Sequence, residues 1–153
     1  MRIIALIFLT LLPFMGQAQC LDTLRFPQAP GTACNPEFYP VCGCDGVTYR
    51  NSCFAEWATV LQWAEGPCEQ VAVNLFPNPV VYQLFAQIAT KFETDVQVYI
   101  FDRNGNIYYQ ADLRNIEYET LIIPVYDFDQ GLYIFMAQSG QDVVLEKFVK
   151  WNE

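Results

Sequence analysis

The chain has 153 residues, with 17 acidic and 8 basic side chains and no histidine, which give a net charge of −9. An acidic surface repels nucleic acid, so we expect no nucleic-acid partner. Serines occur only at positions 52 and 139. Without histidine, neither a Ser-His nor a Cys-His nucleophile pair is available, so we expect no enzyme. No residue pattern indicates a cofactor.

The first 18 residues have the pattern of a secretory signal peptide. Arg2 precedes an apolar core from Ile3 to Met15, and small residues stand before the predicted cut after Ala18. The apolar core is too short to span a bilayer, so we predict no transmembrane helix. Removing the signal leaves 7 basic against 17 acidic residues, a net charge of −10.

All six cysteines lie between positions 20 and 68. An even number of cysteines in an exported segment indicates three disulfides, although their pairing stays open at this point. A lipid anchor on Cys20 would require a small residue before it, but Gln19 stands there. We therefore expect Cys20 to be a disulfide partner. A metal site is disfavoured because the chain has no histidine.

The cysteine distribution predicts two domains behind the signal peptide of residues 1–18. Residues 19–68 are too few for comfortable stability without covalent staples. Residues 74–153 are enough to fold around an ordinary apolar core. We expect residues 69–73 to link the two domains.

Three short elements are predicted in the first domain. Asp45-Gly46 lies between apolar stretches, and because glycine readily adopts positive φ we expect a hairpin with a two-residue turn. Ser52 is expected to cap a helix of about two turns that ends near Ala58. Residues 60–63 are a candidate third strand.

The second domain is predicted to be all-β. Apolar stretches recur at residues 72–76, 80–88, 96–101, 107–110, 120–125, 132–137 and 143–149. Seven short strands in about 80 residues favour a sandwich. Asn104-Gly105 predicts a tight primed-turn hairpin in which Val98 and Ile100 face the core. The many aromatic residues could form a carbohydrate platform, but we favour packing within the sheet.

The middle cysteines of the first domain have a distinctive spacing. Seven residues separate Cys34 from Cys42, and ten separate Cys42 from Cys53. Between Cys42 and Cys53 stand Asp45, Gly46, Thr48, Tyr49 and Asn51. The two gaps and these five residues resemble the second and third cysteine gaps and the motif positions of the Kazal family of serine protease inhibitors. The resemblance covers residues 20 to 68 and implies a small disulfide-rich α+β domain.

The same resemblance implies how the cysteines pair. The family's usual fifth cysteine, shortly after the fourth, is absent here, since Glu56 and Trp57 occupy those places. Cys44 takes over its role. The implied disulfides are Cys34 with Cys53, Cys42 with Cys68 and Cys20 with Cys44.

Kazal inhibitors present a rigid loop that a serine protease binds as a substrate but does not efficiently cut. The resemblance implies that Asn51 holds this loop to the scaffold and that Tyr49 supports it. The implied protease-binding loop consists of Asn35, Pro36, Glu37, Phe38 and Tyr39.

Pro36 is the residue that the resemblance places in the protease's specificity pocket. Proline has no N–H to donate, and its ring fits neither a basic nor a deep aromatic pocket. We therefore expect poor inhibition of trypsin-like and chymotrypsin-like enzymes. Two hypotheses remain open: inhibition of a serine protease that accepts proline or small residues, and a non-inhibitory, disulfide-stapled binding or spacer module.

Four sequence blocks follow one another in the second domain: NLFPNPV at 74–80, VYIFDRNGNIYY at 98–109, DFDQGLYIF at 127–135 and EKFVK at 146–150. In this order the blocks resemble the C-terminal sorting domain of the type IX secretion system. The family's motif positions are matched by Pro77, Asn78, Pro79, Gly105, Gly131 and Tyr133. We expect Gly105 and Gly131 to adopt turn conformations that other residues avoid.

The sorting-domain resemblance implies an Ig-like sandwich and an export route. The partners would be the type IX translocon and a cysteine sortase, and the protein would pass through the periplasm to be secreted or held at the cell surface. Because a processing enzyme needs an exposed segment, we expect cleavage within or near residues 69–74.

Overall fold

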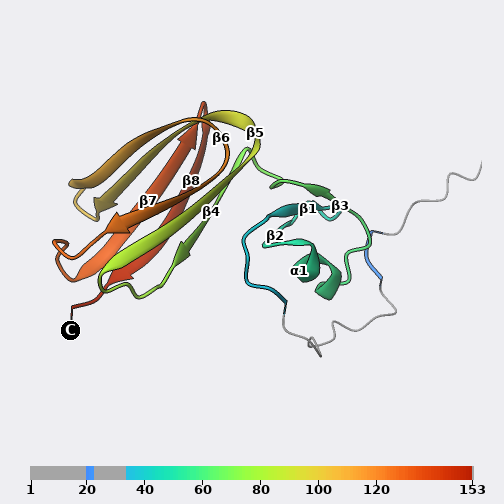
Figure 1. Cartoon of the computed structure of the whole chain (residues 1–153), viewed down its shortest axis with the longest axis horizontal. Coiled ribbons are helices and arrows are strands. Elements are labelled where there is room, and N and C mark those ends of the chain that lie inside the picture. The colour runs from blue at the N-terminus through green and yellow to red at the C-terminus, as the bar shows by residue number, and fades with distance from the viewer. Residues whose placement is uncertain (1–19, 23–33, 153) are drawn as a thin grey trace, which may run out of the picture.

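The computed structural model describes residues 20–22 and 34–152, so the predicted signal peptide lies outside the described residues. A small disulfide-rich module comes first along the chain and a larger sheet region follows it (Figure 1). Within the described residues, no helix is both long and apolar enough to cross a membrane.

Over residues 20–22 and 34–68, the module combines a three-stranded antiparallel sheet with one short helix. Strands β1 (Val41–Gly43), β2 (Thr48–Tyr49) and β3 (Trp63–Glu65) lie in the order β2-β1-β3, and helix α1 spans Ser52–Trp57. In the part of the module that the structure describes, the buried core is small and consists of Val41, Ala55 and Val60. A core of this size is marginal without covalent support.

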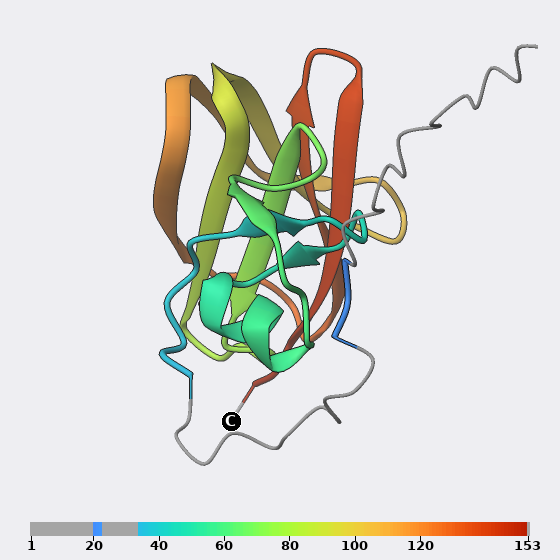
Figure 2. The same ribbon diagram turned by 90° about the vertical axis from the view of Figure 1, so that its right-hand side faces the viewer.

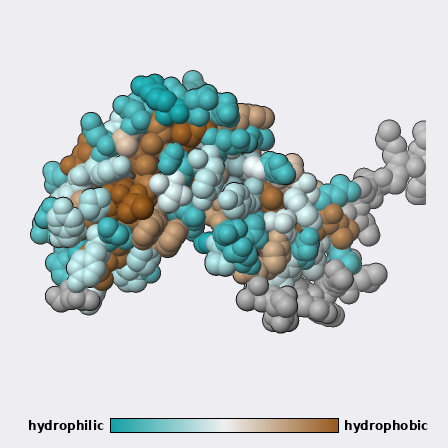
Figure 3. Space-filling model, viewed as in Figure 1, coloured by the Kyte–Doolittle hydropathy of each residue, from teal (hydrophilic) through white to brown (hydrophobic). Residues whose placement is uncertain are grey.

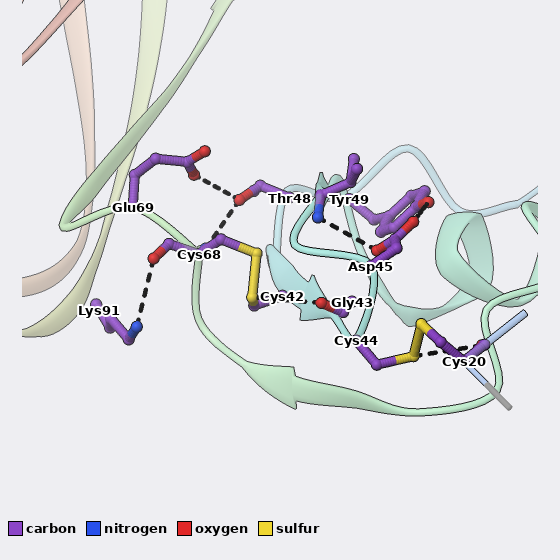
Figure 4. Close-up of a disulfide and its surroundings, with 11 residues drawn as sticks. Cys20, Cys42, Gly43, Cys44, Asp45, Thr48, Tyr49, Cys68, Glu69 and Lys91 are labelled. Atoms are coloured by element: carbon purple, nitrogen blue, oxygen red, sulfur yellow. Dashed lines mark hydrogen bonds between the residues drawn. A yellow bond between two sulfur atoms is a disulfide. The ribbon is translucent and has the colours of Figure 1, made fainter. Parts of the chain in front are cut away.

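Three disulfides provide that support, as predicted. Two of them are labelled in Figure 4, where Cys42 of β1 is joined to the end of the module. The bonded pairs have Cα–Cα distances of 4.7 to 5.8 Å, and no described cysteine is free. The pairs are those that the Kazal resemblance implies: Cys20–Cys44, Cys34–Cys53 and Cys42–Cys68.

Helix α1 begins one residue away from the predicted position. Its N-cap is Asn51, whose backbone is extended and whose side-chain oxygen accepts the N–H of Phe54, and Ser52 is the first helical residue. Asparagine and serine are both good caps, so neighbouring candidates cannot be separated by residue type alone. The helix ends near Ala58, as expected. The third strand was predicted at residues 60–63, but β3 spans Trp63–Glu65. Val60 forms only an isolated bridge, with Leu21.

The two predicted hairpins are confirmed, but their predicted turn type is wrong. Gly46 N donates to Gly43 O (2.9 Å), and Gly105 N donates to Asp102 O (3.0 Å). Each loop has three residues, of which only the last, the glycine, has positive φ, at 77° and 84°. A primed two-residue turn requires positive φ at its first central residue, either together with the second (type I′) or alone (type II′).

The longer loop at Gly105 has a local cause in the side chain of Asp102. Its carboxylate accepts the backbone N–H groups of Asn104 (2.8 Å) and Asn106 (3.0 Å). These two hydrogen bonds fix the backbone of the three-residue loop. Gly131 does not share the conformation of Gly105, because it is the first residue of a strand and has no positive φ. The turn explanation for Gly131 is therefore wrong.

The sheet region contains five antiparallel strands. They are β4 (Val71–Phe76), β5 (Gln83–Asp102), β6 (Ile107–Pro124), β7 (Gly131–Ser139) and β8 (Asp142–Lys150). The order is β4-β5-β7-β8, and β6 also pairs with β5. Figures 1 and 2 show these strands curling together into one body.

The prediction of seven short strands is wrong because four of them are halves of two long ones. Residues 80–88 and 96–101 fall largely within β5, and residues 107–110 and 120–125 within β6. The connecting residues 89–95 and 111–119 contain no glycine or proline that would end a strand. Both strands bend at register shifts instead, beside Asn115 with its φ of 49°.

The bends bring the two ends of the sheet together. Val80, just after β4, forms a parallel bridge with Lys150 of β8, and its N–H donates to Val149 O (2.8 Å). Asn78 Oδ1 accepts the N–H of Val149 (3.0 Å), and Asn78 Nδ2 donates to Lys147 O (3.2 Å). The Pro77-Asn78-Pro79 motif therefore fastens the β4 end of the curl to β8.

The apolar core lies inside the curl. Val98 and Ile100 are fully buried there, as predicted. The largest buried side chains are Phe135 and Phe148, and the ring of Tyr133 stacks on Phe148 with centroids 5.6 Å apart. These rings pack within the sheet, which is the reading that we favoured over a carbohydrate platform.

The junction between the module and the sheet region is short and tied on both sides (Figure 4). Thr48 Oγ1 accepts the N–H of Cys68 (2.8 Å) and donates to Glu69 Oε2 (2.6 Å). From the sheet region, Lys91 donates its side-chain ammonium to Cys68 O (3.3 Å) and its backbone N–H to Gln70 O (3.0 Å). Residues 71–73 of the predicted linker belong to β4.

Candidate functional site

The implied protease-binding loop leaves the Cys34–Cys53 disulfide and runs without regular structure into β1. Asn35, Pro36 and Glu37 are exposed at its tip. Phe38 is only 7% exposed, although it lies next to the tip, and Tyr39 is 62% exposed. The loop therefore has an open first half and a partly covered second half.

Asn51 holds the loop on both sides of Pro36. Its Nδ2 group donates to Asn35 O (2.9 Å) and to Glu37 O (2.8 Å), while its Oδ1 caps helix α1. Asn35 Oδ1 also accepts the N–H of Glu37 (3.1 Å). Because the carbonyls before and after Pro36 are fixed to the helix, the loop's ordering entropy is lost in folding rather than in binding.

Arg50 is a further loop contact, which sequence reasoning missed. Its Nη1 donates to Pro36 O (2.7 Å), and its Nη2 donates to Asn74 Oδ1 (2.7 Å) of β4. The guanidinium thus joins the loop tip to the sheet region. Its place beside Asn51 was the only sequence signal, and that signal does not show which carbonyl an arginine will reach.

Tyr49, the second predicted support, acts within the hairpin. Its hydroxyl donates to Asp45 Oδ2 (2.7 Å), as Figure 4 shows, and its ring packs on the module core around Val41. Burial, together with the hydrogen bond and the charge of Asp45, raises the pKa of Tyr49 to about 12. Tyr49 therefore braces the strands that lead out of the loop, and direct support of the loop itself stays a prediction.

The second half of the loop lies against the sheet region. Phe38 packs with Ala72 of β4 and Ala89 of β5. The ring of Tyr39 stacks on Tyr118 of β6, with centroids 5.5 Å apart and planes 19° apart. Figure 3 shows the module and the sheet region in contact, with a notch between them in this view.

A groove of about 460 Å³ lies beside this contact. Its lining comes from both parts of the chain and includes Tyr39, Asn51, Trp63, Glu65, Glu117 and Tyr118. Among residues 20–22 and 34–152, no cluster of three or more carboxylate or cysteine side chains is arranged to hold a metal ion. What the site offers chemically is a backbone loop held in a fixed shape.

Comparison with known families gives two matches along the chain. The model of the Kazal-type serine protease inhibitor domain matches residues 23–62. The model of the secretion system C-terminal sorting domain matches residues 74–151. Both agree with the two resemblances drawn from the sequence motifs, and the sorting domain indicates export to the cell surface or the extracellular space.

One curated relative shares a short segment with this chain. Protease inhibitor 2 from Cenchritis muricatus is 71% identical over 21 residues, which are 14% of this chain and 42% of the relative. The chain therefore matches less than half the length of that inhibitor.

Proposed function

The chain belongs to the family with a secretion system C-terminal sorting domain and carries a Kazal-type serine protease inhibitor domain ahead of it, and from this premise we propose an exported serine protease inhibitor. The inhibitor acts through the substrate-like loop of residues 35–39. The observation that carries the proposal is the pair of hydrogen bonds from Asn51 to the carbonyls on either side of Pro36.

The bond that a protease attacks would lie between Pro36 and Glu37. A serine protease polarises the carbonyl of the residue in its specificity pocket with backbone donors, and a nucleophilic serine attacks that carbonyl. Asn51 holds the next carbonyl, that of Glu37, so the new end formed by cleavage would stay in place. Because the two new chain ends stay side by side, the peptide bond can form again before the cleaved chain leaves the enzyme.

Pro36 sets the class of target. It supplies no N–H to the protease and fills only a small pocket. The proposed partner is therefore a serine protease that accepts proline or small residues before the cleaved bond. Glu37, Phe38 and Tyr39 would contact the enzyme on the far side of that bond.

The test is a change of the pocket residue in the full mature chain. Pro36→Leu should bring inhibition of chymotrypsin, and Pro36→Arg should bring inhibition of trypsin, because each restores an N–H donor and a pocket-filling side chain. We expect at least tenfold tighter inhibition than the parent, or ~1.4 kcal/mol. The matched control is Pro36→Ala, which restores the N–H without filling either pocket.

Rapid cleavage of both variants, or no interaction with either enzyme, would contradict the proposal. The loop would then not be held in an inhibitory shape. A non-inhibitory, disulfide-stapled binding module would become the better interpretation of the domain.

We also infer that the curled sheet serves as the Ig-like sandwich that the type IX translocon recognises. Its two layers would be the halves of the bent strands β5 and β6, with β4 on one side and β7 and β8 on the other. A cysteine sortase would then separate the module from this domain, and the product would be released or joined to surface lipopolysaccharide. Where the sortase cuts, within or near residues 69–74, also stays a prediction.

The export proposal is tested in a host with a type IX system. Removing residues 71–153 should leave the module in the periplasm, because the signal peptide still acts. Undiminished extracellular module after this deletion would overturn the export route. As the converse test, residues 71–153 attached to an unrelated periplasmic protein should carry that protein out.

A further inference from the structure

Residues of three neighbouring strands lie together on the side of the sheet region that faces the loop. In one row, Ala72 of β4 pairs with Ala89 of β5, and Ala89 pairs with Tyr118 of β6. Two residues further along the strands, Asn74 pairs with Gln87. Residues two apart on a strand share one face. Val71 and Ile88 point into the core, so these five residues lie on the opposite, outer side. We call Ala72, Asn74, Gln87, Ala89 and Tyr118 the docking face.

The apolar part of the docking face fits Phe38. Small side chains at Ala72 and Ala89 leave room for an aromatic ring above the sheet, and the three residues form one buried cluster. Phe38, Ala72 and Ala89 are 7%, 9% and 4% exposed. Burying a phenylalanine side chain removes a large apolar surface from water, so this contact stabilises the attachment of the loop.

The polar part of the docking face continues the attachment as a chain of hydrogen bonds. Arg50 donates to Asn74 Oδ1 (2.7 Å), Asn74 Nδ2 donates to Gln87 Oε1 (2.8 Å), and Gln87 Nε2 donates to the hydroxyl of Tyr118 (2.9 Å). Tyr39 then stacks on the Tyr118 ring. The sheet region therefore contacts the loop at three residues: at Pro36 through Arg50, at Phe38 and at Tyr39.

These are atoms that a protease would also need. A substrate-like loop contacts its enzyme on both sides of the cleaved bond, so the side chains of Phe38 and Tyr39 must face the protease. The oxyanion hole must also donate to Pro36 O, which already accepts from Arg50. The sheet region and a protease therefore compete for the second half of the loop.

We propose that the docking face binds the protease-binding loop within the chain and keeps the inhibitor partly latent, so that inhibition is weakened but not abolished while the sheet region is attached. This inference rests on the proposed inhibitory function. Proteolytic processing separates the module from the sheet region and so relieves the latency. Ala72 and Asn74 of the docking face lie on β4, so they leave with the sheet region, which then no longer holds the loop.

The experiment compares three full-length mature chains, each carrying Pro36→Leu so that chymotrypsin serves as the probe. The first has an intact docking face. The second adds Ala89→Arg, which places a long charged side chain under Phe38 on the outer side of the sheet. The third adds Ile122→Arg as a matched control. Ile122 is 59% exposed on the same side of the sheet, and it pairs with Phe85, which lies outside the docking face.

Two quantities are measured on each chain. One is the inhibition constant for chymotrypsin, and the other is the hydrogen exchange of the backbone amides of residues 35–39 without protease. We expect Ala89→Arg to tighten inhibition at least tenfold and to speed the exchange of the loop amides. Ile122→Arg should leave both unchanged.

Each remaining outcome counts against a distinct statement. Equal inhibition by all three chains would overturn the latency and leave the inhibitory function standing. Unchanged loop exchange in the Ala89→Arg chain would overturn the docking face itself. Faster exchange without inhibition by any chain would overturn the inhibitory function, and with it the latency, and keep the docking face as an interaction surface.

Discussion

The module and the sheet region are stabilised in different ways. Among the described residues, the module buries a core of three residues and relies on three disulfides, whereas the sheet region has no cysteine and buries a core of sixteen residues. A disulfide limits the freedom of the unfolded chain, and a core gains from removing apolar surface from water. The loop lies on the covalently closed part, which needs few side chains for its own stability.

Reduction should separate the two parts most strongly. Each lost bridge typically removes ~2 to 5 kcal/mol from a small domain, so the reduced module should unfold while the sheet region stays folded. Amide NMR spectra before and after reduction and alkylation would show the loss of one set of dispersed signals. If both sets collapse together, the sheet region depends on the module and the comparison fails.

Removing a core side chain from the sheet region should give the opposite result. Phe135 is fully buried, so Phe135→Ala should cost about 3–5 kcal/mol of unfolding free energy. Urea unfolding followed by circular dichroism measures the loss, and the three disulfides should still form. The control is Phe92→Ala, since Phe92 is 66% exposed and its removal should cost about 0.5 kcal/mol or less.

The shared turn offers a test in which both parts should respond alike. Gly46 and Gly105 have φ values of 77° and 84°, and replacing either by alanine should cost about 1–2 kcal/mol. Gly131→Ala is the control, because a glycine without positive φ in open space should tolerate alanine within about 0.5 kcal/mol. Thermal unfolding would measure all three. A much smaller loss at Gly46 would mean that the disulfides override the local backbone penalty.

The smallest effect is expected at alkaline pH. The pKa of Tyr49 in the module and that of Tyr133 in the sheet region are both raised from about 10 to about 12, chiefly by burial. The protonated forms stabilise the fold fully below about pH 10, and this contribution is lost as pH rises toward 12. Hydrogen exchange across this range should show a falling stability in both parts.

Phenylalanine variants assign this pH dependence to its source. Tyr49→Phe should remove the alkaline loss from the module alone. Tyr133→Phe should reduce it in the sheet region alone, where burial also raises the pKa of Tyr109. An unchanged pH profile in the Tyr49→Phe chain would mean that another group controls the alkaline stability of the module.

Local sequence patterns predicted much of the module because its constraints are local. The gaps around Cys42 and the position of Asn51 carried the resemblance to the Kazal family, and that resemblance implied the disulfide pairing and the loop. They did not separate Asn51 from Ser52 as the helix cap, because both residues suit that position. They also missed the three-residue turns, since the same glycine serves either turn type and a carboxylate such as Asp102 decides between them.

The sheet region was harder to divide correctly. Polar residues at 89–95 and 111–119 suggested turns, but long strands that bend at bulges also carry polar side chains there. The absence of glycine and proline was the signal that could have joined the halves. The contacts of Phe38 with Ala89 and of Arg50 with Asn74 had no local signal at all, because their partners come from a different domain.

The two-residue junction also decides how the protein tumbles in solution. Modules joined by a flexible linker rotate independently, each with the rotational diffusion of its own size. Here only Glu69 and Gln70 lie between Cys68 and β4, and Lys91 bonds to the backbone on both sides of Glu69. The amides of the small module should therefore relax with the slow correlation time of the whole chain, as the rigid end of a single particle.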